Sequence, residues 1–183
     1  MVKRRSEAAV TPTRKVARKT PRSARPAVRW MVLRVVLQRQ AGEDLPDPPG
    51  RDLLVNRTHS FADLAAGIDR AFARWDRSHL HEFRFPDGRV IGMAETDEFG
   101  EHEEELDDRT ETLGAAGLTV GDSFDYLFDF GDGWEHTCAL LRDGVDPRAE
   151  FGGMPADIVP IFGWGSIPDQ YGRLTPDAGA DDE

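Results

Sequence analysis

The order of apolar and polar positions along the chain predicts a set of strands. Residues 30–38 are rich in Val and Leu and predict a first strand, and a short second strand is predicted at 53–56. The stretch GEDLPDPPG at 42–50 has the glycines and prolines of a loop. Two hairpins follow, 80–85 with 89–93 and 124–130 with 134–141, each joined by a turn that contains Asp-Gly. These patterns predict a mostly antiparallel sheet.

A capping signal and an apolar stripe predict one main helix. Ser60 can cap the first backbone amides, and Asp63 stands three residues on as its capping-box partner. The apolar positions that follow fall on one helical face: Phe61, Leu64, Ala65, Ile68 and Phe72. We expect this helix to pack on the sheet and to end near Trp75.

Two other stretches lack such a pattern. Residues 95–108 hold nine carboxylates in fourteen positions, which predicts an exposed loop. From Arg142 onward, Gly, Pro and isolated aromatic residues predict an irregular arm wrapped over the domain. The sequence thus predicts an α+β fold: a mostly antiparallel sheet packed on one main helix, with an irregular C-terminal arm and a disordered basic N-terminal tail.

Charge divides the chain into two unlike parts. Its 183 residues carry a net charge of -11 at pH 7. Residues 1–27 hold nine of the 23 Lys and Arg but one of the 34 Asp and Glu, which leaves +8 there and -19 in the rest. This tail has no apolar periodicity, so burial cannot offset the entropy of ordering it. We predict a disordered tail at 1–27, one α+β domain at 28–175 and a disordered acidic end at 176–183.

Few features point to a compartment. No apolar core of about 7–15 residues precedes Trp30, and the apolar stretch at 30–37 is far shorter than a membrane span. The one cysteine, Cys138, excludes an internal disulfide framework and has the neighbours of a buried strand position. We therefore expect a cytoplasmic protein without a membrane partner.

The basic tail allows two interpretations. Its positive side chains would release counterions from nucleic-acid phosphates, which gives weak, salt-sensitive affinity for any sequence. The alternative is an extension that only keeps the protein soluble. The acidic residues 101–105 (EHEEE) could in turn attract divalent cations or a basic partner, including this tail. The nine tail residues are Lys3, Arg4, Arg5, Arg14, Lys15, Arg18, Lys19, Arg22 and Arg25.

Two histidines suggest a metal site. His79 and His81 are two residues apart on a predicted strand, so both side chains would project from one face, and Asp132 or His136 could be a third ligand. Such a set would suit zinc or manganese. We favour the alternative that these histidines bond carboxylates or backbone at the edge of an aromatic core.

The second hairpin carries further candidate chemistry. Asp129, Asp132, Glu135 and His136 crowd it, and a histidine beside carboxylates can form a general acid–base pair. Asp-Gly is also what a tight turn requires, and we favour that interpretation. A set of aromatic residues could line or cover a pocket for a flat ligand, although core packing is the more frequent role. These residues are Trp75, Trp134, Trp164 and Tyr171.

Four segments in order resemble the plasmid pRi ORF-3-like family. They are AFARWDRSHLHEFRF (71–85), the acidic stretch, FDYLFDFGDGWEH (124–136) and FGWGSIPDQYGR (162–173). The resemblance implies a compact α+β fold with a mostly antiparallel sheet. Members of that family also carry the label of TnpR-type passengers of insertion elements. A serine recombinase needs an activated Ser in an arginine-rich site, which this acidic body lacks, so we interpret the label as mobile-element context.

The sequence favours a binding or accessory protein of a plasmid or mobile element over an enzyme. Its partners would be nucleic acid, contacted without sequence preference by the tail, and another protein. We predict no cofactor for this function. The alternative is a metal-dependent, hydrolase-like enzyme that uses His79, His81, Asp132 and His136.

Overall fold

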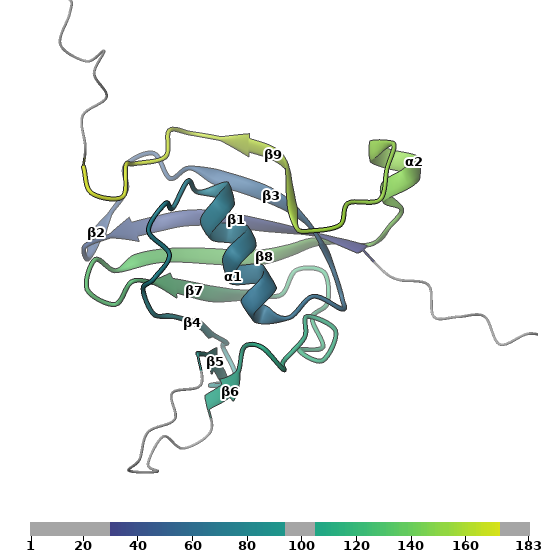
Figure 1. The fold of residues 1–183 in the computed structure, drawn as a ribbon, viewed down its shortest axis with the longest axis horizontal. Coiled ribbons are helices and arrows are strands. Elements are labelled where there is room, and N and C mark those ends of the chain that lie inside the picture. Colours follow the sequence, from purple (N-terminus) through teal and green to yellow (C-terminus); the bar gives the residue numbers. More distant parts are fainter. Residues whose placement is uncertain (1–29, 94–104, 173–183) are drawn as a thin grey trace, which may run out of the picture.

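The computed structural model of the chain describes residues 30–93 and 105–172 (Figure 1). In these two stretches the chain forms nine strands and two helices. The strands are β1 (Trp30–Gln40), β2 (Glu43–Asp44), β3 (Gly50–Asn56), β4 (His81–Arg84), β5 (Val90–Gly92), β6 (Glu105–Asp107), β7 (Ser123–Phe128), β8 (Trp134–Val145) and β9 (Val159–Trp164). The helices are α1 (Phe61–Ala71) and α2 (Pro147–Phe151).

All nine strands belong to one sheet. Its order is β6-β5-β4-β7-β8-β1-β3-β9, with β2 added to the end of β1. Neighbouring strands are antiparallel, except that β5 and β6 run parallel. The predicted α+β fold is thus confirmed in its coarse form: the described residues are rich in strands, which make one mixed sheet, and have few helices. The predicted tail at 1–27 and acidic end at 176–183 lie outside the described residues.

Helix α1 begins where its capping signal predicts. The Ser60 hydroxyl accepts from the Asp63 amide at 3.1 Å, and the Asp63 carboxylate accepts from the Ser60 amide at 2.9 Å. The helix ends at Ala71, four residues before the expected end at Trp75. The reason is the backbone of Ala73, whose φ of 54° is left-handed and cannot continue a right-handed helix.

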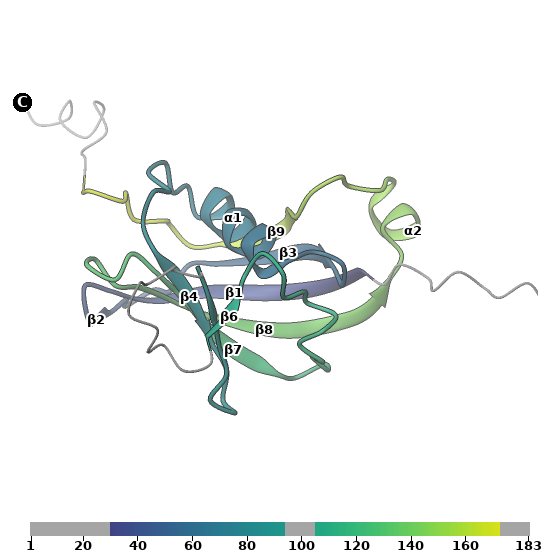
Figure 2. The same ribbon diagram turned by 60° about the horizontal axis from the view of Figure 1, so that its bottom comes forward.

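The core lies between α1 and one face of the sheet (Figure 2). Phe61 and Ile68 of α1 are fully buried, and the Phe61 ring lies 5.0 Å from that of Phe83 on β4 in an edge-on contact. Cys138 is buried on β8, and burial raises the pKa of its thiol. Neither helix of the described ranges is long and apolar enough to cross a membrane.

The prediction of an exposed loop at 95–108 is wrong at its C-terminal end. Residues 94–104 lie outside the described part of the chain, but Glu105–Asp107 form β6 beside β5. Leu106 packs against the core, and Asp108 is 2% exposed because its carboxylate bonds His81. Residues 105–108 are thus held by strand pairing, by the packing of Leu106 and by the contact between Asp108 and His81.

The prediction of an irregular arm after Arg142 is also wrong in part. Strand β8 continues to Val145, α2 follows, and β9 pairs with β3 as the edge of the sheet. Pro160 pairs with Leu53, and the register of the two strands shifts between Leu53 and Asp52. Because Pro160 has no amide hydrogen, such a strand is confined to an edge. Residues 165–172 form no strand and run on as a strap.

Candidate functional site

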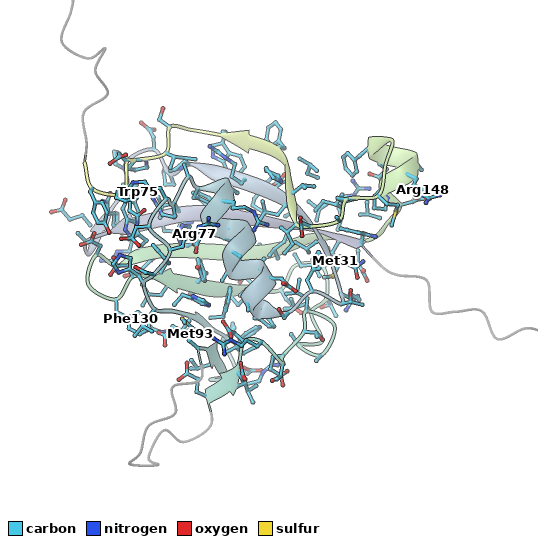
Figure 3. All side chains as sticks on the ribbon, in the orientation of Figure 1. Met31, Trp75, Arg77, Met93, Phe130 and Arg148 are labelled. Atoms are coloured by element: carbon cyan, nitrogen blue, oxygen red, sulfur yellow. The ribbon has the colours of Figure 1, made fainter. Side chains whose placement is uncertain are left out.

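Three segments meet at one end of the sheet: residues 72–80 after α1, the β7–β8 turn, and the strap. Asp129 fixes the turn, since its carboxylate accepts from the Gly131 amide at 3.0 Å and the Asp132 amide at 3.3 Å. Its backbone φ is 57°, a left-handed conformation that Asp tolerates. Trp75 and Phe130 lie at this end, and Arg148 lies at the opposite end (Figure 3).

His79 stands at the centre of this end, between groups from all three segments. Its Nδ1 lies 3.3 Å from Asp129 Oδ2. Its Nε2 lies 3.0 Å from the Tyr171 hydroxyl and 3.5 Å from Asp76 Oδ2. The Tyr171 hydroxyl donates to that same Asp76 oxygen at 2.9 Å. The histidine thus joins two carboxylates and one phenol that are far apart in the sequence.

The electrostatics of the cluster keep its phenol protonated. The Ser78 hydroxyl and amide, and then Tyr171, lower the pKa of Asp76 to about 2. The hydrogen bond to Asp76 raises the pKa of Tyr171, to which the charges of Asp129 and Asp132 also contribute. The ionised Asp76 carboxylate therefore accepts a hydrogen bond from Tyr171, and the proton stays on the phenol. A phenol in this state is a hydrogen-bonding group and not an activated nucleophile.

The strap is fastened to the segment after α1 by one amide side chain. Gln170 is 2% exposed, and its Oε1 accepts from the Trp75 and Asp76 amides at 3.1 Å each. Its Nε2 donates to the Asp76 carbonyl at 2.8 Å. Three hydrogen bonds from one buried side chain fix the position of Tyr171, which is the next residue.

Large aromatic rings stand exposed around the cluster. Trp75 is 51% exposed, Phe130 52% and Tyr171 45%, and the Trp75 and Tyr171 rings meet edge-on at 4.9 Å. We call this region the hairpin-end surface. It consists of Trp75, Asp76, His79, Asp129, Phe130 and Tyr171.

The structure does not bring the two other histidines to this surface. His81 Nε2 lies 2.8 Å from Asp108 Oδ2, with its ring next to Tyr126. His136 is 2% exposed, and its ring lies 4.9 Å from that of Phe72. Glu135 pairs instead with Arg39. The predicted polar cluster on the second hairpin is therefore divided between two sides of the sheet.

The predicted metal set is not assembled. In the stretches that the structure describes, no three His, Cys, Asp or Glu side chains are grouped so that they could hold a metal ion. His79 bonds Asp129, His81 bonds Asp108, and His136 is enclosed by the core. The metal-dependent alternative has no support in this geometry.

His136 serves the core as a neutral imidazole. Its Nδ1 lies 3.1 Å from the Trp134 carbonyl and 3.3 Å from the Tyr126 carbonyl, and since carbonyls only accept, Nδ1 carries the proton. Burial, followed by the charge of Arg74, lowers the pKa of His136 to about 3. The local sequence GWEH at 133–136 does not indicate that His136 makes these backbone contacts.

Trp134 and Trp164, the other two tryptophans of the predicted pocket set, have different surroundings. Trp134 is fully buried, and the Arg74 guanidinium lies 3.5 Å from its ring centre. Trp164 donates from Nε1 to the Pro48 carbonyl at 3.1 Å. It also lines an open pocket of about 330 Å³ together with Arg51 and Phe162. The prediction that Trp164 lines a pocket thus agrees with its place beside this hollow.

Sequence reasoning missed a buried polar group beneath this end of the sheet. Tyr126 donates to Asp69 at 2.9 Å, and burial raises the pKa of Asp69 to about 6. Arg74 is 3% exposed, and burial lowers its pKa to about 10. The sequence indicates the burial of these residues only weakly. Asp69 directly follows the buried Ile68, and Arg74 comes after the last apolar position of the helix.

Comparisons with known proteins give a family and a fold. A sequence model of the plasmid pRiA4b ORF-3-like protein family matches residues 32–150. The uncharacterized protein y4hQ of Sinorhizobium fredii (strain NBRC 101917 / NGR234) is 37% identical over 94 residues, which are 48% of this chain. The match covers 40% of that relative, so the chain spans less than half of its length. Neither match carries a TnpR label, and the mobile-element context stays a prediction.

A solved structure shares the fold. The crystal structure of the protein of unknown function MM3350 from Methanosarcina mazei Go1 is similar with a TM-score of 0.59 and 22% identity. The similarity covers 74% of this chain and 70% of that one. The family match begins within β1, ends within α2 and includes α1 and both hairpins. This chain therefore belongs to the plasmid pRiA4b ORF-3-like protein family.

Proposed function

We propose that this protein is a binding or accessory protein whose basic tail contacts nucleic acid without sequence preference. The observation that carries the proposal is the separation of charge, +8 in residues 1–27 against -19 in the rest. The acidic body repels phosphates, so affinity for nucleic acid has to come from the tail. The two parts would then meet different partners.

The chemistry of the hairpin-end surface supports binding over catalysis. Its phenol, Tyr171, keeps its proton because it donates to an ionised Asp76. Asp129 is committed to the amides of its own turn. The third polar group, His79, contacts Asp129 of the β7–β8 turn and Tyr171 of the strap. These residues hold three segments together instead of leaving a nucleophile and a base facing free space.

The test uses fluorescence anisotropy with a labelled DNA duplex of arbitrary sequence. In one full-length variant, the nine Lys and Arg of residues 1–27 become Gln. In the control, three exposed body arginines, Arg77, Arg109 and Arg148, become Gln. We expect binding by the wild-type and control proteins at low salt, and none by the tail variant. Equal binding by the tail variant and the wild type would refute the proposal.

We further propose that the hairpin-end surface is the contact for a protein partner. Exposed aromatic rings around polar groups are enriched at such interfaces. A photo-crosslinking residue at Phe130, introduced in cells that carry the gene, should give one discrete protein adduct. The control position, Arg148, lies at the opposite end of the sheet and should give none (Figure 3). The same adduct pattern at both positions, or none at Phe130, would contradict the assignment.

A further inference from the structure

The side chain of Arg74 is buried without the partners that a guanidinium needs. It is 3% exposed, and Nε, Nη1 and Nη2 all lack a hydrogen-bond partner among the described residues. One face of the group is covered by the Trp134 ring at 3.5 Å. The stacking leaves the five N–H bonds, which lie in the guanidinium plane, unsatisfied. A buried charge in this state is costly unless acceptors reach it.

Two more unsatisfied atoms lie around Arg74. Trp134 Nε1 and His136 Nε2 are buried and have no partner within the described stretches. The two residues are i and i+2 on β8, so their side chains project from the same face of the sheet. Arg74 contacts the Trp134 ring and acts electrostatically on His136. The three residues therefore form one buried polar group.

The balance of donors and acceptors in this group determines what it can bind. Arg74 offers five N–H bonds and Trp134 offers one. His136 offers a single acceptor, because its Nδ1 proton already faces backbone carbonyls and leaves a lone pair on Nε2. Asp69 does not fill the deficit, since its carboxylate bonds Tyr126 and makes no hydrogen bond with Arg74. An occupant that supplies two or more acceptor oxygens matches this excess of donors.

The strap is bonded to the chain directly after Arg74. Gln170 bonds the backbone of Trp75 and Asp76, the two residues directly after Arg74. Tyr171 adds a hydrogen bond to Asp76 at the exposed edge. A few side-chain hydrogen bonds thus hold one short segment against the two residues that follow Arg74. Their release would loosen the chain next to the guanidinium.

We propose that Arg74, Trp134 and His136 form a buried binding site for a small oxyanion, a carboxylate or a phosphate. Arg74 would hold two oxygens with its planar fork, as guanidinium groups do with both kinds of anion. Trp134 would donate to one of these oxygens. The neutral His136 would accept from a protonated oxygen or from a water molecule beside the ligand.

The test follows two side-chain signals of the intact protein by NMR. The Arg74 Nε–H and Trp134 Nε1–H resonances are assigned with the Arg74→Lys and Trp134→Phe variants. Sodium phosphate and sodium acetate are titrated separately, with sodium chloride at matched ionic strength as the reference. We expect both signals to shift together and to saturate with one of the two oxyanions. The anion that saturates the shift identifies the site as a phosphate or a carboxylate site.

Variants sharpen the result. Arg74→Lys keeps the charge but loses the fork, so affinity read from the Trp134 signal should fall at least about tenfold. Arg77→Lys, an exposed position three residues on, should leave the affinity unchanged. Gln170→Ala should speed exchange between free and bound signals. The proposal would be overturned if neither oxyanion shifted the wild-type signals, or if Arg74→Lys and the wild type had equal affinity. The wild-type titration decides even where a variant does not fold.

Discussion

The buried His136 makes the stability of the fold depend on pH in a direction that one substitution isolates. Its pKa is about 3 in the fold, against 6.5 for a free histidine, because of burial and then the charge of Arg74. The fold therefore prefers the neutral imidazole. A depressed pKa contributes stability that is present above about pH 6.5 and is lost as the pH falls towards 3.

The size of the effect follows from the two pKa values. Acidification from about pH 8 to about pH 5 should remove roughly 2 kcal/mol through His136. Asp69 acts in the opposite direction, since burial raises its pKa to about 6 and the fold prefers its protonated form. The same acidification should return roughly 1 kcal/mol through Asp69. The two effects partly cancel in the pH dependence of the wild-type unfolding free energy. Single substitutions separate them.

The assay is urea unfolding of wild type, His136→Asn and Asp69→Asn at a series of pH values between about 5 and 8. The free-energy gap between wild type and His136→Asn should shrink by roughly 2 kcal/mol towards the acid end, because only the wild type has the imidazole to protonate. Relative to Asp69→Asn, the wild type should gain roughly 1 kcal/mol. A gap for His136→Asn that stays constant with pH would refute the burial of a neutral imidazole.

Two further predictions concern the frame of the fold, and both are measured by urea unfolding. A Cβ at Gly50 would lie 2.0 Å from the Trp164 ring, so Gly50→Ala should cost about 1–3 kcal/mol and loosen β9. Gly153→Ala, where an added Cβ meets nothing within 4 Å, is the control and should change stability by less than about 0.5 kcal/mol. Ser60→Ala removes the acceptor for the Asp63 amide and should cost about 1 kcal/mol; an unchanged midpoint would show that the cap contributes nothing.

Local signals made most of the sheet and the start of α1 predictable. The pair Ser60 and Asp63 marks a helix start within four residues, and both hairpins carry their own turns. Strand β9 could not be found in this way. Pro160 and Gly163 interrupt its pattern, and its order comes from pairing with β3, about a hundred residues earlier in the chain. Such pairing depends on tertiary structure and leaves little local trace.

Some members of the candidate site could be named from the sequence, but Asp76, Phe130 and the grouping of the site could not. His79, Asp129 and Tyr171 do meet, although they lie in three separate segments. His136 was placed with them because it follows the same turn, yet its strand directs it into the core. Arg74 was missed because a charged residue after an apolar helix is normally exposed. In the structure Arg74 is 3% exposed, with Trp134 against its guanidinium and the strap bonded to the two residues that follow it.

The central claim is that a cationic tail gives this acidic protein its affinity for nucleic acid. The most direct measurement is the slope of log affinity for duplex DNA against log salt, between about 50 and about 200 mM NaCl. Nine tail cations set the limit at about -8, and we predict a steep negative slope within that limit. A slope near zero would mean that phosphate contacts do not hold the complex, and would contradict the account.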